Sequence, residues 1–184
     1  MRRLMVFNQV SADGYIADRN GDMSWAHKHD PEWTAFVSGN ASGGGTLLFG
    51  RVTYQMMASY WPTPQAAANM PVVAERMNAL PKIVFSRTLQ DAPWNNTKLL
   101  KGGLAEEVRA MKESAGEDIV ILGSASIVSQ LARAALIDEY QMVVNPVVLG
   151  AGKSMFAGLD KRLDLRLVKS RIFSNGNVLL CYEA

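Results

Sequence analysis

The sequence predicts an α/β fold with a mainly parallel central sheet, helices on both faces and an antiparallel hairpin at its C-terminal edge. Three observations support this. Short β-branched runs alternate with segments of helical spacing along most of the chain. The segment 117–156 reads as a buried strand, a small-residue turn, a helix, a second strand and a glycine loop. Asn175-Gly176 lies between two β-like runs, which predicts a hairpin closed by a type I′ turn.

The first half of the chain begins with a strand and then alternates. Pro31 can open a helix with Asp30 as its N-cap, because proline fits the first helical position and an Asp side chain accepts a free backbone N–H. Gly50 ends one strand, and prolines in the segment 61–64 break the helix before them. The predicted strands are Leu4–Val10, Tyr15–Ala17 and Thr46–Phe49, and the predicted helices after Pro31 are Arg51–Tyr60 and Ala66–Leu80, the last with or without a loop.

The second half repeats the alternation and then becomes purely β-like. Apolar β-branched runs predict the strands, and apolar residues at helical spacing predict the helices. The predicted strands are Lys82–Phe85, Lys98–Leu100, Ile119–Leu122, Leu165–Phe173 and Val178–Glu183, and the predicted helices are Leu104–Ser114 and Ile127–Leu136.

Length and composition predict one globular domain spanning residues 1–184. Hydrophobic residues make up 48%, charged residues 20%, and the net charge is +2, which does not favour nucleic-acid binding. Cys181 is the only cysteine, so an intrachain disulfide and a metal–thiolate cluster are excluded. No segment has the length of a transmembrane helix or of a signal-peptide core. We therefore expect a cytoplasmic protein that does not associate with membranes.

Small, hydroxylated or basic residues follow three of the predicted strands. In a parallel sheet the carboxyl ends of the strands form one edge, where ligands bind. Helix N-termini attract phosphate there, because free N–H groups and the helix dipole act together. Each segment alone is better read as an ordinary turn or cap, but together, on one edge of one sheet, they predict a phosphate site. The candidates are Gly50, Arg51 and Thr53, then Ser86, Arg87 and Thr88, then Gly123, Ser124, Ala125 and Ser126.

Other motifs do not lead to a site. Gly152-Lys153-Ser154 resembles the end of a P-loop, but Val147 stands where the first glycine is needed. A dinucleotide-binding G-x-G-x-x-G is absent, since Ala125 and Val128 occupy the later glycine positions. His27 and His29 are the only histidines, and we interpret them as exposed polar residues, with no metal site.

Asp13, Asp30 and Trp25 have both structural and functional interpretations. Asp13 is most simply a turn residue, Asp30 a helix N-cap, and Trp25 part of the core or of a pocket wall. In the functional interpretation Asp30 anchors the substrate in an apolar pocket with Trp25 and Trp33 nearby, and Asp13 is a second catalytic candidate.

Several stretches, in their order and spacing, resemble the dihydrofolate-reductase-like fold. The resemblance is closer to the reductase domain at the C-terminal end of bifunctional riboflavin-biosynthesis proteins and to its stand-alone relatives. It spans nearly the whole chain. The matching stretches are 10–17 (VSADGYIA), 48–54 (LFGRVTY), 82–89 (KIVFSRTL), 122–125 (LGSA), 136–140 (LIDEY) and 145–152 (NPVVLGAG).

The resemblance implies NADPH as cofactor. It places phosphates at Arg51, Thr53, Ser86 and Arg87, and the pyrophosphate against the segment 123–126. Such proteins often have a Gly-Gly pair where this chain has Gly123-Ser124. Two arginines near one phosphate favour NADPH over NADH, because only NADPH carries the extra dianion. Relatives in the riboflavin pathway usually bind a phosphoribosyl substrate, to which Lys153 could supply a cation.

We therefore expect an NADPH-dependent reductase that transfers hydride to a small heterocyclic or sugar-linked substrate. The nearest named activity is reduction of 5-amino-6-(5-phosphoribosylamino)uracil. Dihydrofolate reduction is an alternative, since Trp25 and Asp30 have the spacing of an aromatic and an acid on the substrate side of those enzymes. A non-catalytic nucleotide-binding protein is another. The resemblance also implies a homodimer.

Overall fold

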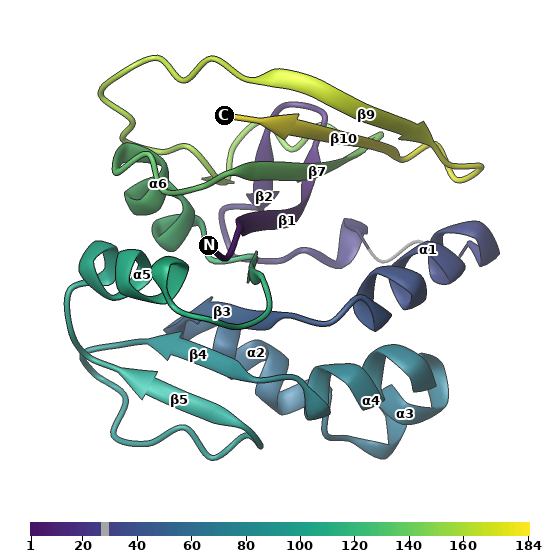
Figure 1. The fold of residues 1–184 in the computed structure, drawn as a ribbon. Coiled ribbons are helices and arrows are strands. Elements are labelled where there is room, and N and C mark those ends of the chain that lie inside the picture. Colours follow the sequence, from purple (N-terminus) through teal and green to yellow (C-terminus); the bar gives the residue numbers. More distant parts are fainter. Residues whose placement is uncertain (27–29) are drawn as a thin grey trace.

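The computed structural model of the chain describes residues 1–26 and 30–184, so His27 and His29 lie outside the described residues. The expected mainly parallel sheet is present, with the strand order β5-β4-β3-β6-β1-β7-β10-β9 (Figure 1). Its strands are β1 (Leu4–Ser11), β3 (Thr46–Gly50), β4 (Lys82–Phe85), β5 (Thr97–Leu100), β6 (Ile119–Leu122), β7 (Glu139–Asn145), β9 (Arg166–Ile172) and β10 (Val178–Glu183). The short strands β2 (Tyr15–Ala17) and β8 (Lys153–Ser154) pair separately.

Short helices connect these strands, and none in the described part of the chain has the length and apolar character needed to cross a membrane. They are α1 (Pro31–Ser42), α2 (Arg51–Tyr60), α3 (Pro64–Asn69), α4 (Pro71–Ala79), α5 (Leu104–Glu113) and α6 (Ala125–Arg133), with a 3-10 turn at Ser24–Ala26.

Strand direction determines where a ligand site can form. Strands β5, β4, β3, β6, β1 and β7 pair in parallel, whereas β10 runs antiparallel to both β7 and β9. The carboxyl ends of the parallel strands therefore lie along one edge. Gly50, Ser86 and Gly123 each stand at this edge, at the end of β3, after β4 and after β6.

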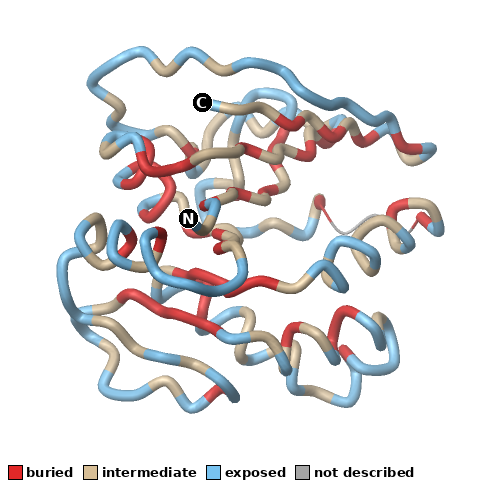
Figure 2. The backbone as a smooth tube through the Cα atoms, in the orientation of Figure 1, coloured by how far each residue is buried: buried red, intermediate tan, exposed pale blue. Residues whose placement is uncertain are grey.

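Apolar side chains cover the sheet on both faces. One cluster packs α5 and α6 on residues such as Val6, Leu48 and Ile121. A second cluster packs α1, α2 and α4 on Leu47, Phe49 and neighbouring residues, and a third packs Trp33 of α1 on Val143 and Leu179. Burial is concentrated in the central strands, whereas β9 is exposed along its whole length (Figure 2).

Three details of the sequence-based assignment needed correction. The segment 66–80, expected as a helix with or without a loop, belongs to two helices that begin at Pro64 and Pro71, because Pro71 disfavours a helical conformation at Met70, which has φ −144° and ψ 69°. The helix after β6 begins at Ala125 and ends at Arg133. The hairpin between β9 and β10 is present, but its turn is not type I′: Gly176 takes a positive φ of 86°, whereas Asn175 does not.

Lys82 is a buried cation at the start of β4. It is 1% exposed. Its ammonium donates to the carbonyl oxygens of Met77 (2.8 Å), Asn78 (3.1 Å) and Leu80 (2.7 Å). These carbonyls end α4, so the ammonium satisfies groups that a helix leaves unpaired. Burial lowers the pKa of Lys82 to about 8.

This burial predicts a pH dependence of stability. The ordinary Lys pKa is 10.5, so between about 8 and 10.5 the unfolded chain binds more protons than the folded one. The free energy of unfolding should therefore rise with pH across this window, by on the order of 3 kcal/mol in total. In urea titrations, Lys82→Met should remove that rise. The exposed Lys98 on β5 provides a control, Lys98→Met, which should retain it. An unchanged pH slope in Lys82→Met would contradict the assignment.

Candidate functional site

A large cleft opens along the carboxyl edge of the parallel strands. Its volume is ≈ 1570 Å³. Sites for one small ligand usually measure about 300–1,000 Å³, so this cleft has room for a cofactor and a second molecule. Arg51, Arg87 and Gly123 all line it, although they lie far apart in the sequence. The sequence-predicted phosphate residues are thus brought together in one place.

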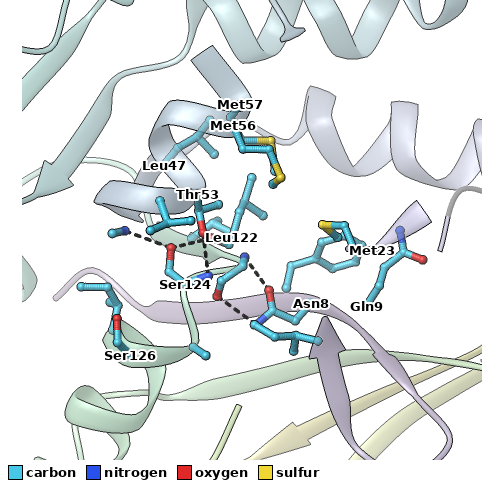
Figure 3. Close-up of a pocket in the computed structure, with 18 of the residues that line it drawn as sticks. Asn8, Gln9, Met23, Leu47, Thr53, Met56, Met57, Leu122, Ser124 and Ser126 are labelled. Atoms are coloured by element: carbon cyan, nitrogen blue, oxygen red, sulfur yellow. Dashed lines mark hydrogen bonds between the residues drawn. The ribbon is translucent and has the colours of Figure 1, made fainter. Parts of the chain in front are cut away.

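The centre of the cleft is the turn between β6 and α6. Gly123 has a φ of +58°, and Asn8 of β1 contacts its peptide groups from the side (Figure 3). The Asn8 Oδ1 accepts from the Gly123 N–H at 2.5 Å, and the Asn8 Nδ2 donates to the Gly123 carbonyl at 3.1 Å. Asn8 is 3% exposed. A buried amide therefore satisfies both backbone groups of this glycine.

Ser124 continues the turn in a left-handed conformation, with φ 56° and ψ 54°. This conformation is unfavourable for a residue with a Cβ, so other contacts must stabilise it. The Ser124 hydroxyl accepts from the Gly50 N–H (2.9 Å) and donates to the Leu122 carbonyl (3.1 Å). The Thr53 hydroxyl accepts from the Ser124 N–H at 3.0 Å. Thr53 and Ser124 thus hold the turn in place and do not cap their own helices by side-chain bonds.

The N-terminus of α6 then faces the cleft. The backbone N–H groups of Ala125 and Ser126 have no acceptor among the described residues, and both residues line the cleft. Free N–H groups at a helix start, together with the helix dipole, attract a phosphate.

Three cations stand at the ends of β3, β4 and β5. These are Arg51, Arg87 and Lys101, all exposed and all lining the cleft. Arg51 donates to Gln55 at 3.1 Å, whereas Arg87 has no ion-pair partner within the described residues. Ser86 fixes the loop beside Arg87, since its hydroxyl accepts from the N–H groups of Thr88 and Leu89. This side of the cleft is therefore suited to a polyanion.

The opposite side of the cleft is less charged. Lys153 of β8 lines it beside Gly21, and Gln9 of β1 and Met23 contribute further side chains. No Asp or Glu occurs among the described residues that line the cleft. Nor do the described residues contain a group of three His, Cys, Asp or Glu side chains that could hold a metal ion.

Of the substrate-side candidates, Lys153 lines the cleft, whereas Asp13, Asp30 and Trp25 do not. Asp30 caps α1: its carboxylate accepts from the Trp33 N–H (2.7 Å) and the Ser174 hydroxyl (2.6 Å), and the Ser174 hydrogen bond chiefly lowers its pKa. Trp25 donates its indole N–H to the Asp22 carbonyl at 3.3 Å. Asp30 therefore takes the N-cap role predicted from the sequence, whereas Trp25 is half-buried and belongs neither to the hydrophobic clusters of the described residues nor to the wall of the cleft.

Asp13 also has a structural role, because its carboxylate holds two loops together. It accepts from the Ser11 hydroxyl (2.6 Å) and from the N–H groups of Leu149 (3.1 Å) and Gly150 (2.7 Å). The Ser11 hydrogen bond chiefly lowers the pKa of Asp13. Asp13 joins the loop after β1 to the loop after β7, so its placement gives no support to a catalytic role.

Asn8 and Lys101 are site residues that the sequence reasoning missed. Asn8 interrupts an otherwise apolar run, LMVF, in the first predicted strand, and a polar residue there is a signal that could have found it. Lys101 follows the predicted strand Lys98–Leu100, so the strand-end argument used for Arg51 and Arg87 applies to it equally.

Comparison with known proteins places this geometry in a family. The family model of the RibD C-terminal domain matches residues 2–179. The uncharacterized protein YyaP of Bacillus subtilis (strain 168) is 31% identical over 184 residues, which cover 99% of this chain and 95% of that protein. The uncharacterized protein YwjB of the same organism is 26% identical, covering 94% of this chain and 92% of that protein.

Solved structures share the fold. A protein from Shewanella sp. PV-4 provisionally assigned to riboflavin biosynthesis has a TM-score of 0.75 at 24% identity, covering 98% of both chains. The diaminohydroxyphosphoribosylaminopyrimidine deaminase/5-amino-6-(5-phosphoribosylamino)uracil reductase of Thermotoga maritima has a TM-score of 0.69 at 16% identity, covering 99% of this chain and 56% of that one. At these identities the similarity establishes the dihydrofolate-reductase-like architecture only.

Proposed function

The chain belongs to the RibD C-terminal domain family, and from this membership we propose that it is an NADPH-dependent reductase acting on a small heterocyclic or sugar-linked substrate. The observation that carries the proposal is the convergence of Arg51, Arg87 and the Gly123–Ser124 turn on one cleft. These elements offer free cations and free N–H groups to a phosphorylated dinucleotide.

The residues of the cleft fit this cofactor by their chemistry. The amides of Ala125 and Ser126 would bind the pyrophosphate, and Arg51 and Arg87 would bind further phosphate oxygens by charge-assisted hydrogen bonds. When bound, the nicotinamide supplies the hydride. The protein would orient both molecules and exclude water from between them. The described lining has no carboxyl group to donate a proton, so we propose that water supplies it.

We propose 5-amino-6-(5-phosphoribosylamino)uracil as the first substrate to test. Lys153 stands on the side of the cleft away from Arg87 and could bind its phosphate. Dihydrofolate is the weaker candidate. A pteridine held through a protonated ring nitrogen needs a carboxylate, and the described lining of the cleft contains none.

The direct test is NADPH oxidation, followed by the loss of absorbance of the reduced nicotinamide, with a panel of aminouracil ribotides and pterins. The proposal expects turnover with at least one of them. NADPH binding without turnover across the panel would instead favour a non-catalytic nucleotide-binding protein. Absence of NADPH binding would refute the cofactor assignment.

Arg87→Ala should weaken NADPH binding more than NADH binding. One charge-assisted contact to the 2′-phosphate contributes about 1.5–3 kcal/mol, so the dissociation constant for NADPH should rise about 10- to 150-fold by calorimetry. Arg109 is an exposed arginine on α5 that does not line the cleft, and Arg109→Ala should leave both constants unchanged. Equal losses for NADPH and NADH in Arg87→Ala would remove Arg87 from the 2′-phosphate role.

A further inference from the structure

Gln9 of β1 presents a free hydrogen-bond donor to the cleft. The residue is half-buried and lines the cleft. Its Oε1 accepts a hydrogen bond from the Asn145 Nδ2 at 3.3 Å. Its Nε2 has no acceptor among the described residues, and it is not one of the unpartnered polar atoms that are sealed from the surface. The amide nitrogen of Gln9 is therefore available to a bound molecule.

Asn145 determines which end of the Gln9 amide faces the cleft. Asn145 is 0% exposed, and its Nδ2 also donates to the carbonyl oxygens of Val143 at 3.0 Å and Val10 at 3.4 Å. Backbone carbonyls can only accept hydrogen bonds, so this end of the Asn145 side chain must be the nitrogen. Gln9 must then turn its oxygen toward Asn145, because two amide nitrogens facing each other would both lack an acceptor. The Gln9 Nε2 consequently points away from Asn145 and toward the cleft.

Gln9 lies away from the residues proposed for the cofactor phosphates. Figure 3 shows Gln9 beside Met23, on the far side of the open space from Ser126. Lys153 lines the same side of the cleft as Gln9, whereas Arg87 lines the other. A molecule that contacts Gln9 is therefore the second molecule for which the cleft has room.

The surroundings of Gln9 determine which chemical group can use this donor. The described lining of the cleft contains no Asp or Glu, so no carboxylate of these residues competes for the Gln9 Nε2. An amide nitrogen only donates, so a carbonyl oxygen of a ligand would complete the hydrogen bond. A ligand amino group in the same place would leave two donors facing each other without acceptors, which is unfavourable where water has limited access.

We propose that the Gln9 Nε2 donates a hydrogen bond to a carbonyl oxygen on the ring of the substrate, and so selects oxo-substituted over amino-substituted pyrimidines. This inference deepens the proposed function and rests on it, since it explains how the same site would recognise an aminouracil. It predicts that the uracil form of such a substrate binds more tightly than a form with an amino group in the place of that oxygen. Lys153 remains available for the phosphate of the ribosyl chain.

The test compares two pyrimidines of similar size and opposite hydrogen-bonding pattern. 6-Aminouracil carries ring oxygens, whereas 2,4,6-triaminopyrimidine carries amino groups in their place. Both are titrated into the ¹⁵N-labelled protein with and without NADP⁺, at a pH at which both rings are uncharged, and binding is followed by NMR. 6-Aminouracil should bind about tenfold more tightly and should shift the side-chain amide resonance of Gln9. Equal affinities, or no shift at Gln9, would overturn the proposal.

The variant Gln9→Glu should produce an effect that a purely structural role of Gln9 would not. A glutamate has nearly the same shape, and its carboxylate can still accept from the Asn145 Nδ2. Its second oxygen would accept from an amino group and repel a carbonyl oxygen, so the preference should reverse in favour of 2,4,6-triaminopyrimidine. Gln9→Leu, which neither donates nor accepts, should bind the two rings within about twofold of each other. An unreversed preference in Gln9→Glu would refute the assignment.

Gln130→Glu is the matched control. Gln130 also lines the cleft, but it stands on α6 and its Nε2 already donates to the Ser126 carbonyl at 2.8 Å. The same exchange of an amide for a carboxylate there should leave the preference between the two rings unchanged within about twofold. A reversal of similar size in Gln130→Glu would mean that the added charge, and not the position of Gln9, causes the effect, and the proposal would be wrong.

These measurements separate the role of Gln9 from the redox assignment. Ring binding is measured without turnover, so the expected preference together with a failure to oxidise NADPH would support the role of Gln9 and refute the reductase. Turnover of an aminouracil ribotide by a protein that shows no preference between the two rings would refute the role of Gln9 and support the reductase.

Discussion

Replacing Asn8 by leucine is expected to abolish NADPH binding and to lower the free energy of unfolding by about 2–6 kcal/mol. Leucine has a similar volume but cannot pair with the Gly123 N–H and carbonyl, which Asn8 satisfies at 2.5 and 3.1 Å. Each backbone group left unpaired in a buried position costs about 1–3 kcal/mol. Because the same turn would present the helix N-terminus to the cofactor, affinity and stability should fall together. Urea unfolding and calorimetric titration measure the two losses.

Gln9 provides the control for this substitution. It is the next residue on β1 and also lines the cleft, but its side chain accepts a longer hydrogen bond, of 3.3 Å, from the Asn145 side chain. Gln9→Leu should lower stability by less than about 1 kcal/mol. If Asn8→Leu lost no more stability than Gln9→Leu, the turn would not depend on Asn8.

Gly123→Ala should also be strongly destabilising, by about 2–5 kcal/mol. A Cβ at this position would lie 2.9 Å from Thr53 Cγ2 and 3.1 Å from Thr53 Oγ1, and the φ of +58° is unfavourable for alanine. Left-handed backbone costs roughly 1–2 kcal/mol and overpacking about 1–3 kcal/mol. Thermal and urea unfolding would measure this, and NADPH titration would report whether the displaced turn still binds.

Two further variants separate the steric part from the backbone part. Gly14 has a φ of +87°, and a Cβ added there would meet no atom within 4 Å, so Gly14→Ala should show the cost of backbone conformation alone. Adding Thr53→Ser to Gly123→Ala removes the Cγ2 methyl but keeps the hydroxyl that accepts from Ser124, and should restore part of the lost stability. If the double variant regained no stability, the contact with Thr53 would not be the cause of the loss in Gly123→Ala.

The fold could be predicted because the residues that mark the ends of each element agree with the alternation of strands and helices along the chain. The helix over 51–60 and the strands over 82–85 and 119–122 have the predicted bounds, since glycine, proline and apolar periodicity mark their ends. The turn type at Asn175-Gly176 could not be predicted in the same way. The φ of Asn175 depends on the hydrogen bonds of the whole loop and not on the Asn-Gly pair alone. In this loop the Phe173 N–H donates to the Asn177 carbonyl at 2.9 Å.

Of the candidate site, only the side with the proposed phosphate-binding residues could be predicted from the sequence. The rule that parallel strands end at a common edge brings Arg51, Arg87 and Gly123 together without any knowledge of side-chain packing. The substrate side depends instead on which way each side chain points. Asp30 could anchor a ligand or cap a helix with the same residues around it in sequence. In the structure one carboxylate oxygen accepts from the Trp33 N–H and the other from the hydroxyl of Ser174, 144 positions away, so both oxygens are engaged.

The anchoring of the Gly123–Ser124 turn by distant segments of the chain has a consequence for how a nucleotide would associate. Asn8, Thr53 and Gly50 already hold this turn, so the donors of α6 are preorganised and little conformational entropy remains to be lost at the moment of encounter. A nucleotide should therefore bind at this turn without a change in its backbone conformation. Local unfolding of this turn should therefore cause no loss of binding below the temperature at which the sheet itself melts.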